Sequence, residues 1–222
     1  MAFINYSRRE IQLKIVYYGC ALCGKTTNLI SLHQRINSAQ KGELVSLSTD
    51  ADRTLFFDFL SLSTKTLPGF NTRFQLYTVP GQPVYNTTRQ LVLKGVDGIV
   101  FVVDSHWDKM AENVESFSNL QENLIQNHLS LAQIPYILQY NKRDLPNAAP
   151  IHYLEFTFNN RATKVLSYEA VASNGDGILE TLNGVSRLLL AKYSKSAGNN
   201  TNVDVTAPAA PATAPSGSGA SL

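Results

Sequence analysis

Residues 19–26 read Gly-Cys-Ala-Leu-Cys-Gly-Lys-Thr, and this short run restricts the fold more than any other feature of the 222-residue chain. An apolar, β-branched strand pattern over 11–18 comes directly before it. From Lys25 onward the apolar residues fall on one side of a predicted helix, at Leu29, Leu32 and Ile36. Glycines between a strand and a helix let backbone N–H groups turn towards an anion, and the helix start adds partial positive charge. We therefore predict a phosphate-binding loop.

The side chains at the end of this loop have defined roles in phosphate binding. Lys25 would reach the β- and γ-phosphates of a nucleotide, and Thr26 would place its hydroxyl on Mg²⁺. The candidate nucleotide-binding residues of the loop are Gly19, Cys20, Ala21, Leu22, Cys23, Gly24, Lys25, Thr26 and Thr27.

Cys20 and Cys23 allow a different interpretation. A Cys-x-x-Cys pair at a helix start is also typical of thioredoxin-like redox centres and of some metal sites. A redox centre leaves Gly24-Lys25-Thr26 unexplained, and zinc would need two further ligands, for which the four histidines have no convincing spacing. Inert loop cysteines are the simpler interpretation, and we keep a redox protein as an alternative.

Strand and helix patterns alternate along the rest of the chain. Further strands are predicted over 72–79, 98–104, 135–141 and 164–171, and helices over 86–93, 109–128, 149–156 and 177–193. Residues 54–62 suit either a strand or a helical turn, and we predict an edge strand there. Alternation implies right-handed crossovers, so we expect an α/β fold: a P-loop NTPase three-layer sandwich with a mostly parallel sheet of about six strands and helices on both faces.

Composition excludes several classes of protein. A net charge of +2 without a basic helix face gives no reason to expect nucleic-acid binding. No apolar run reaches about 18 residues, so no membrane span is expected. The N-terminus lacks the apolar core of a secretory signal, and Ala2 and the final Gly-Ala-Ser-Leu lack the common lipid-anchor motifs. We expect a monomeric cytoplasmic protein in a reducing compartment.

The composition changes near residue 195. Residues 195–222 are mainly Ser, Gly, Asn, Thr, Ala and Pro, with no aromatic side chain. Such a segment buries too little surface to offset the entropy of ordering. We predict one domain over 1–194 and a disordered tail over 195–222.

Asn141-Lys142-Arg143-Asp144 follows a predicted strand, and its Asn-Lys-x-Asp pattern resembles the guanine-recognition motif of Ras-like GTPases. The resemblance implies that Asp144 accepts two hydrogen bonds from guanine, which adenine cannot offer. It also implies that Asn141 ties the loop together and that the Lys142 stem covers the base. A weaker match at 169–173 places Val171 and Ala172 beside guanine, with the Ala172 N–H on the guanine oxygen.

Within these GTPases, the chain resembles the bacterial mutual gliding-motility (MglA) family from about residue 2 to residue 193. The matching stretches are 3–7, 14–19, 52–59, 77–82 and 140–147. The resemblance implies a GTP/GDP switch with Mg²⁺ that controls polarity and gliding or pilus-related motility and is recruited to a cell pole. The implied partners are a roadblock-domain activator of the MglB type and response-regulator-like or tetratricopeptide polarity proteins.

The second switch segment departs from the usual Ras-like pattern. It reads Thr-Val-Pro-Gly-Gln over 78–82, so Thr78 replaces the aspartate that supports Mg²⁺. The MglA family shares this change, which implies that metal support shifts to the first switch. We expect Thr54 to bind Mg²⁺, with Asp52 or Asp58 in a supporting role, and Gly81 to lie beside the nucleotide.

The resemblance also supplies the catalytic candidates. Gln82 would orient the attacking water, and Arg53 would be the arginine that this family supplies from within the same chain. Ala21 stands where Ras-like proteins commonly have glycine, and its methyl group would crowd Gln82. We therefore expect slow hydrolysis. A GTP-binding scaffold with negligible hydrolysis stays as an alternative.

Overall fold

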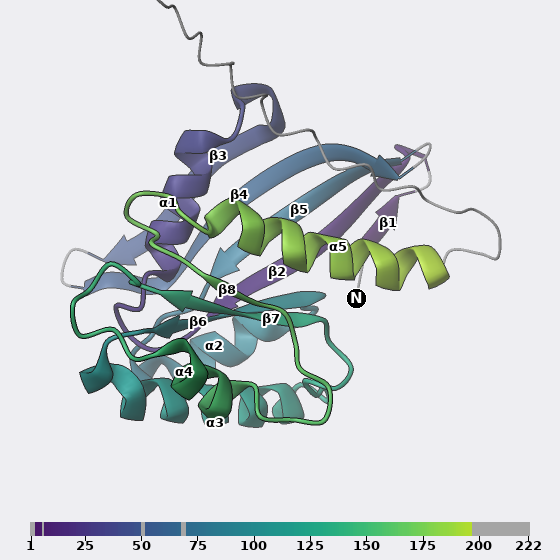
Figure 1. Ribbon diagram of the computed structural model, residues 1–222. Coiled ribbons are helices and arrows are strands. Elements are labelled where there is room, and N and C mark those ends of the chain that lie inside the picture. The colour runs from purple at the N-terminus through teal and green to yellow at the C-terminus, as the bar shows by residue number, and fades with distance from the viewer. Residues whose placement is uncertain (1–2, 6, 50–51, 68–69, 197–222) are drawn as a thin grey trace, which may run out of the picture.

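The computed structural model describes residues 3–5, 7–49, 52–67 and 70–196, which form a twisted sheet with helices on both faces (Figure 1). The expected α/β sandwich is confirmed. In chain order the elements are β1 (Phe3–Asn5), β2 (Glu10–Tyr18), α1 (Lys25–Arg35), η1 (Ser38–Gln40), β3 (Lys41–Thr49), β4 (Asp52–Leu67), β5 (Phe70–Thr78), η2 (Pro83–Tyr85), α2 (Asn86–Leu93), β6 (Gly98–Asp104), η3 (Trp107–Lys109), α3 (Met110–Gln126), β7 (Tyr136–Asn141), α4 (Ile151–Phe158), β8 (Ser167–Glu169) and α5 (Ile178–Ser196).

The sheet follows the order β3-β4-β5-β2-β6-β7-β8, and β1 pairs antiparallel with β2. The pairs from β5 to β8 are parallel, whereas β4 is antiparallel to both of its neighbours, β3 and β5. The described part of the chain thus has eight strands, where about six were expected. The two short or polar strands β1 and β3 account for the difference, because neither has the apolar run that identifies a strand in a sequence.

The prediction that 54–62 is an edge strand was wrong. The segment lies inside β4, a strand of 16 residues that pairs with β3 on one side and β5 on the other. β3 forms the edge instead, and Gly42, Glu43 and Val45 on it are exposed. Polar and exposed side chains are typical of edge strands, and they hide such a strand from a search for apolar runs.

The two faces of the sheet carry separate cores. One core packs α1 and α5 against the sheet, with Leu29, Leu32 and Leu189 buried. The other packs α2, α3 and α4 against the opposite face, with Phe101, Leu120 and Leu154 buried. All residues of β6 and β7 are buried, as expected for central parallel strands covered on both sides. The loops that follow the parallel strands β2, β5, β6, β7 and β8 therefore open at one rim of the sheet.

The boundaries near the C-terminus differ from the prediction. β8 covers only Ser167–Glu169 of the strand predicted over 164–171. α5 continues to Ser196, so the first two residues of the predicted tail are helical, and 197–222 lie outside the described residues. No helix in the described ranges combines the length and the apolar character needed to cross a bilayer.

Candidate nucleotide-binding site

The loop over 19–24 has the geometry of a phosphate cradle. Gly24 has a φ of 102°, and a Cβ on it would lie 2.2 Å from Asn141 Nδ2, so only glycine fits. α1 starts directly after it at Lys25. The Lys25 side chain is buried, and its ammonium donates to the carbonyls of Gly19 (3.0 Å) and Cys20 (2.7 Å). The cation is thus held across the loop at the start of a helix, where an anion is stabilised.

Leu22 is exposed and has a positive φ of 61°. Thr27 lies in the first turn of α1.

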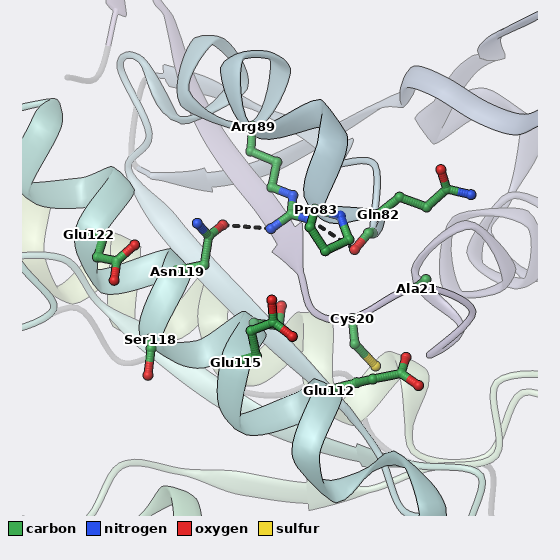
Figure 2. A pocket seen from close by; sticks show the side chains of 12 residues that line it. Cys20, Ala21, Gln82, Pro83, Arg89, Glu112, Glu115, Ser118, Asn119 and Glu122 are labelled. Carbon is green, nitrogen blue, oxygen red and sulfur yellow. Dashed lines mark hydrogen bonds between the residues drawn. The ribbon is translucent and has the colours of Figure 1, made fainter.

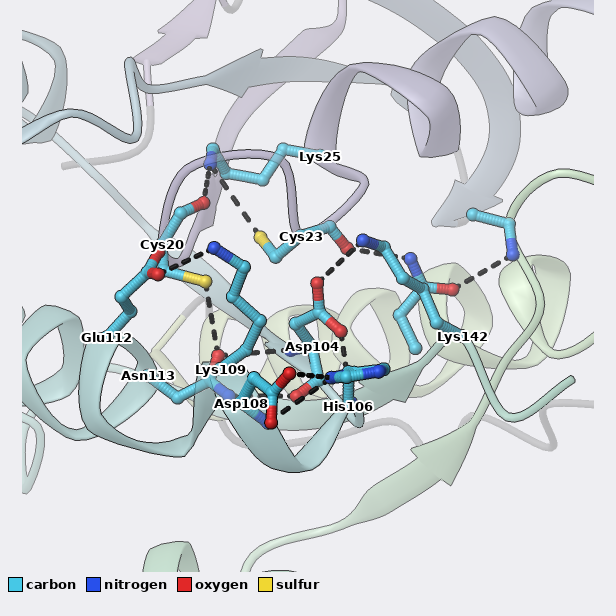
Figure 3. A network of polar contacts seen from close by, with 12 residues as sticks. Cys20, Cys23, Lys25, Asp104, His106, Asp108, Lys109, Glu112, Asn113 and Lys142 are labelled. Atoms are coloured by element: carbon cyan, nitrogen blue, oxygen red, sulfur yellow. Dashed lines mark hydrogen bonds and ion pairs between the residues drawn. The ribbon is translucent and has the colours of Figure 1, made fainter. Parts of the chain in front are cut away.

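Cys20 and Cys23 are free thiols, and both are buried (Figure 3). The Cys20 thiol donates to Asn113 Oδ1 (3.3 Å), and Lys25 Nζ lies 3.7 Å from Cys23 Sγ. Burial raises the pKa of Cys23, but the hydrogen bond from Cys20 and the Lys25 ammonium outweigh it and lower this pKa to about 7. The hydrogen bond to Cys23, followed by burial, raises the pKa of Cys20. The thiol of Cys20 therefore holds its proton far more tightly than the thiol of Cys23 does.

Thr26 and Thr78 meet at one buried carboxylate, that of Asp58. The Thr26 hydroxyl donates to Asp58 Oδ2 (2.5 Å), the Thr78 hydroxyl to the same oxygen (2.9 Å), and the Ser46 hydroxyl to Oδ1 (2.6 Å). Asp58 is 1% exposed and has no ion-pair partner in the described ranges. A buried carboxylate normally has a cation beside it. Hydroxyl and carboxylate oxygens are the ligands that Mg²⁺ prefers, so this donor set fits Mg²⁺.

Asn141 joins the phosphate loop to both predicted guanine loops. Its Nδ2 donates to the carbonyl of Cys23 (2.8 Å), and its Oδ1 accepts from the N–H of Ala172 (2.9 Å). This N–H was expected to meet guanine, but it is bonded within the protein. Val171 lies next to it and bridges to Asp176. These hydrogen bonds hold the three loops in one position relative to each other.

Asp104 and Arg143, to which the sequence analysis gave no role, position the guanine loops. Lys142 has a φ of 64°, and its ammonium pairs with the buried carboxylate of Asp104 at 2.6 Å (Figure 3). Arg143 donates to Glu169 Oε2 (3.0 Å) and to the carbonyl of Ala149 (2.7 Å), which links the loop after β7 to β8. Asp144 is exposed at the rim. The sequence signal that could have identified Asp104 is its position as the last residue of a buried strand, β6.

The switch segment lies directly on the phosphate loop. A Cβ on Gly81 would lie 2.4 Å from the Cα of Ala21, so the two backbones are in contact. Arg89 is buried and holds this segment by donating to the carbonyls of Pro80 (3.0 Å) and Gly81 (2.9 Å). Gln82 follows Gly81 and is exposed. The backbones of Arg53 and Thr54 belong to β4, but their side chains lie outside the described part of the structure.

Comparison with known proteins gives two matches. The model of the ADP-ribosylation factor family matches residues 2–189. The mutual gliding-motility protein MglA of Myxococcus xanthus (strain DK1622) is 53% identical over 195 residues, which cover 88% of this chain and 99% of that protein.

Proposed function

Because this chain belongs to the ADP-ribosylation factor family of small GTPases, we propose that it is a Mg²⁺-dependent guanine-nucleotide switch that controls bacterial cell polarity and motility. The chain is a GTPase that binds guanine nucleotides. Family membership also favours the GTPase over the alternative of a Cys-x-x-Cys redox protein.

The observation that carries the proposal is the position of Asn141. Its side chain binds the phosphate loop through Cys23 and the loop after β8 through Ala172. A nucleotide held by its phosphates at Lys25 would thus extend its base towards the loops that follow β7 and β8. Asp144 would accept two hydrogen bonds from guanine there, and adenine would leave this carboxylate unpaired.

Asp58 supports the dependence on Mg²⁺. Thr26 would hold the ion, and Asp58 would support it in place of the aspartate that Thr78 replaces, with Thr54 as a further candidate ligand. When bound, Mg²⁺ would neutralise charge on the phosphate oxygens. Gln82 would orient the attacking water, and Arg53 would stabilise the developing charge from within the same chain.

Ala21 supports slow hydrolysis. Its backbone contacts Gly81, and Ala21, Gly81 and Gln82 line the same cavity, so a side chain at position 21 is close to the loop that carries Gln82. A slow enzyme needs an activator to be a useful switch, and we propose a roadblock-domain activator of the MglB type. The GTP form would bind response-regulator-like or tetratricopeptide polarity proteins and would be recruited to a cell pole.

The test is to load the purified chain with radiolabelled GTP and Mg²⁺, with ATP as competitor, and to measure retained nucleotide and released phosphate. We expect retention that ATP does not reduce and slow phosphate release, which Gln82→Ala lowers about 100-fold. The control is Gln133→Ala, an exposed glutamine near the amino end of β7, which should change neither quantity.

Two other outcomes are decisive. Equal phosphate release by wild type and Gln82→Ala, with GTP retained, would favour the scaffold without hydrolysis. Absence of retained guanine nucleotide would overturn the proposal.

A further inference from the structure

A cavity of about 380 Å³ lies behind the phosphate loop, between η2 and α3 (Figure 2). Cys20 and Ala21 form one wall, Gln82 and Pro83 another, and α3 forms the third. Its volume is within the range of cavities that bind small ligands.

The α3 wall carries a row of carboxylates. Glu112, Glu115 and Glu122 all line the cavity, and their spacing along α3 places them on one face of the helix. Glu112 is paired with Lys109 at 2.6 Å. Glu115 and Glu122 have no ion-pair partner in the ranges that the structure describes.

Among the described residues that line the cavity, Arg89 is the one cation, and it is already bound. The Arg89 guanidinium donates hydrogen bonds to the carbonyls of Pro80 and Gly81 and to Asn119 Oδ1 (2.5 Å; Figure 2). It therefore faces neutral acceptors, and the carboxylates of α3 keep an excess of negative charge in the cavity.

A buried hydroxyl on the same wall also lacks a partner. Ser116 is 5% exposed and lines the cavity, and its Oγ has no hydrogen-bond partner among the described residues. Buried polar groups are nearly always hydrogen-bonded, so this hydroxyl, which can both donate and accept, indicates a polar ligand. This observation is independent of the carboxylates. The carboxylates favour a cation, and the hydroxyl can accept a hydrogen bond from it.

We propose that this cavity binds the guanidinium group of an arginine side chain presented by a partner protein. A guanidinium has five N–H donors in a plane and can reach separated acceptors such as Glu115, Glu122 and the Ser116 hydroxyl. The methylene stem of the arginine would pack on Pro83 and Cys20, as long basic side chains commonly do on apolar surface.

Binding in this cavity is coupled to the nucleotide. Cys20, Ala21, Gly81 and Gln82 line the cavity and also belong to the phosphate loop and the switch segment. A guanidinium that fixes these residues changes the affinity for the nucleotide, and by linkage the nucleotide changes the affinity for the guanidinium. The site itself does not depend on GTP hydrolysis.

The experiment compares two probes of nearly the same shape, N-acetyl-arginine amide and the uncharged N-acetyl-citrulline amide. Each is titrated into the full-length chain loaded with GDP, and amide chemical shifts over 81–82 and 112–122 are followed. We expect saturable shifts with the arginine probe only. Glu115→Gln/Glu122→Gln should weaken binding of this probe about fivefold or more, because two carboxylate contacts are lost.

Glu180→Gln is the matched control, because Glu180 is an exposed carboxylate on α5, which covers the opposite face of the sheet. It should leave binding of the arginine probe unchanged. Absence of saturable shifts, equal shifts with citrulline, or equal binding by the double variant would each overturn the proposal.

Discussion

Asp58 and Thr78 bind each other twice across two adjacent strands. The Asp58 N–H donates to Thr78 Oγ1 (2.8 Å), and the Thr78 hydroxyl donates to Asp58 Oδ2 (2.9 Å). β4 and β5 are antiparallel there, with Phe59 opposite Tyr77. The carboxylate that Thr78 lacks is therefore supplied by the neighbouring strand at the same level of the sheet.

The first prediction concerns this carboxylate. Asp58→Asn should lower GDP affinity in Mg²⁺ about 10- to 100-fold, because the group that supports the metal ligand Thr26 loses its charge. Without Mg²⁺, in EDTA, the variant and wild type should bind GDP equally. Fluorescent-GDP titration measures both.

Two comparisons make this test specific. Asp108→Asn, at an exposed carboxylate, should have no effect. Thr78→Asp added to Asp58→Asn should restore much of the affinity, because it returns a carboxylate to the adjacent position. An equal loss in Mg²⁺ and EDTA would mean that Asp58 acts on the fold and not through the metal.

Asp144 should determine the base. In Asp144→Asn, one carboxylate oxygen becomes an NH₂ donor, which opposes the N2 amino group of guanine but suits the oxygen that xanthine carries there. We expect GTP affinity to fall about 100-fold and XTP affinity to rise. Competition against fluorescent GDP checks both. Unchanged selectivity would remove Asp144 from the site, and Asp176→Asn serves as the control.

Ala21 should limit hydrolysis. Ala21→Gly removes a methyl group next to Gly81 and Gln82, and we expect single-turnover phosphate release to accelerate about tenfold. GDP affinity should stay within about twofold, because the backbone N–H groups are unchanged. A rate equal to that of wild type would show that the methyl group does not crowd the reaction.

Asn28 and Gln139 should stabilise the junction between α1 and β7. Both side chains are buried, and each donates to the other at 2.9 Å. Asn28→Ala would leave Gln139 partly unpaired, so we expect a loss of about 1–3 kcal/mol in unfolding free energy. The double variant Asn28→Leu/Gln139→Leu should lose less than the sum of the single changes. Urea unfolding measures wild type, Asn28→Ala, the two single leucine variants and the double variant, and strict additivity of the leucine changes would contradict the pairing.

Cys23 should make stability depend on pH. The folded thiol has a pKa of about 7, below its ordinary value of 9.0, so between these values the folded chain has released a proton that the unfolded chain keeps. Stability should therefore rise from pH 7 to 9 and be lost as the pH falls through 7. Cys20, whose pKa is raised, opposes this only above pH 9.

The measurement is the unfolding free energy of wild type and Cys23→Ala at several pH values. The rise should be absent in Cys23→Ala. The same rise in both proteins would assign it to other groups.

Local patterns predicted a large part of this fold. α2 covers the predicted 86–93 and β6 the predicted 98–104, because a buried strand and an amphipathic helix each leave a periodicity in the sequence. β3 has no such periodicity, so the sequence did not predict it. Without β3, the segment that forms β4 was predicted to be the edge strand. The loops of the site could be located because each follows a strand end.

The sequence by itself determined the strand, glycine loop and helix around Lys25, and the order of the loops along one rim, since these follow from local spacing and chirality. Only the tertiary structure decided that Asp58 stands beside Thr26, that Asn141 binds the Ala172 N–H, and that α3 turns its carboxylates towards Cys20. These contacts join residues far apart in the chain, and strand register and helix packing, which no local pattern encodes, set their distances.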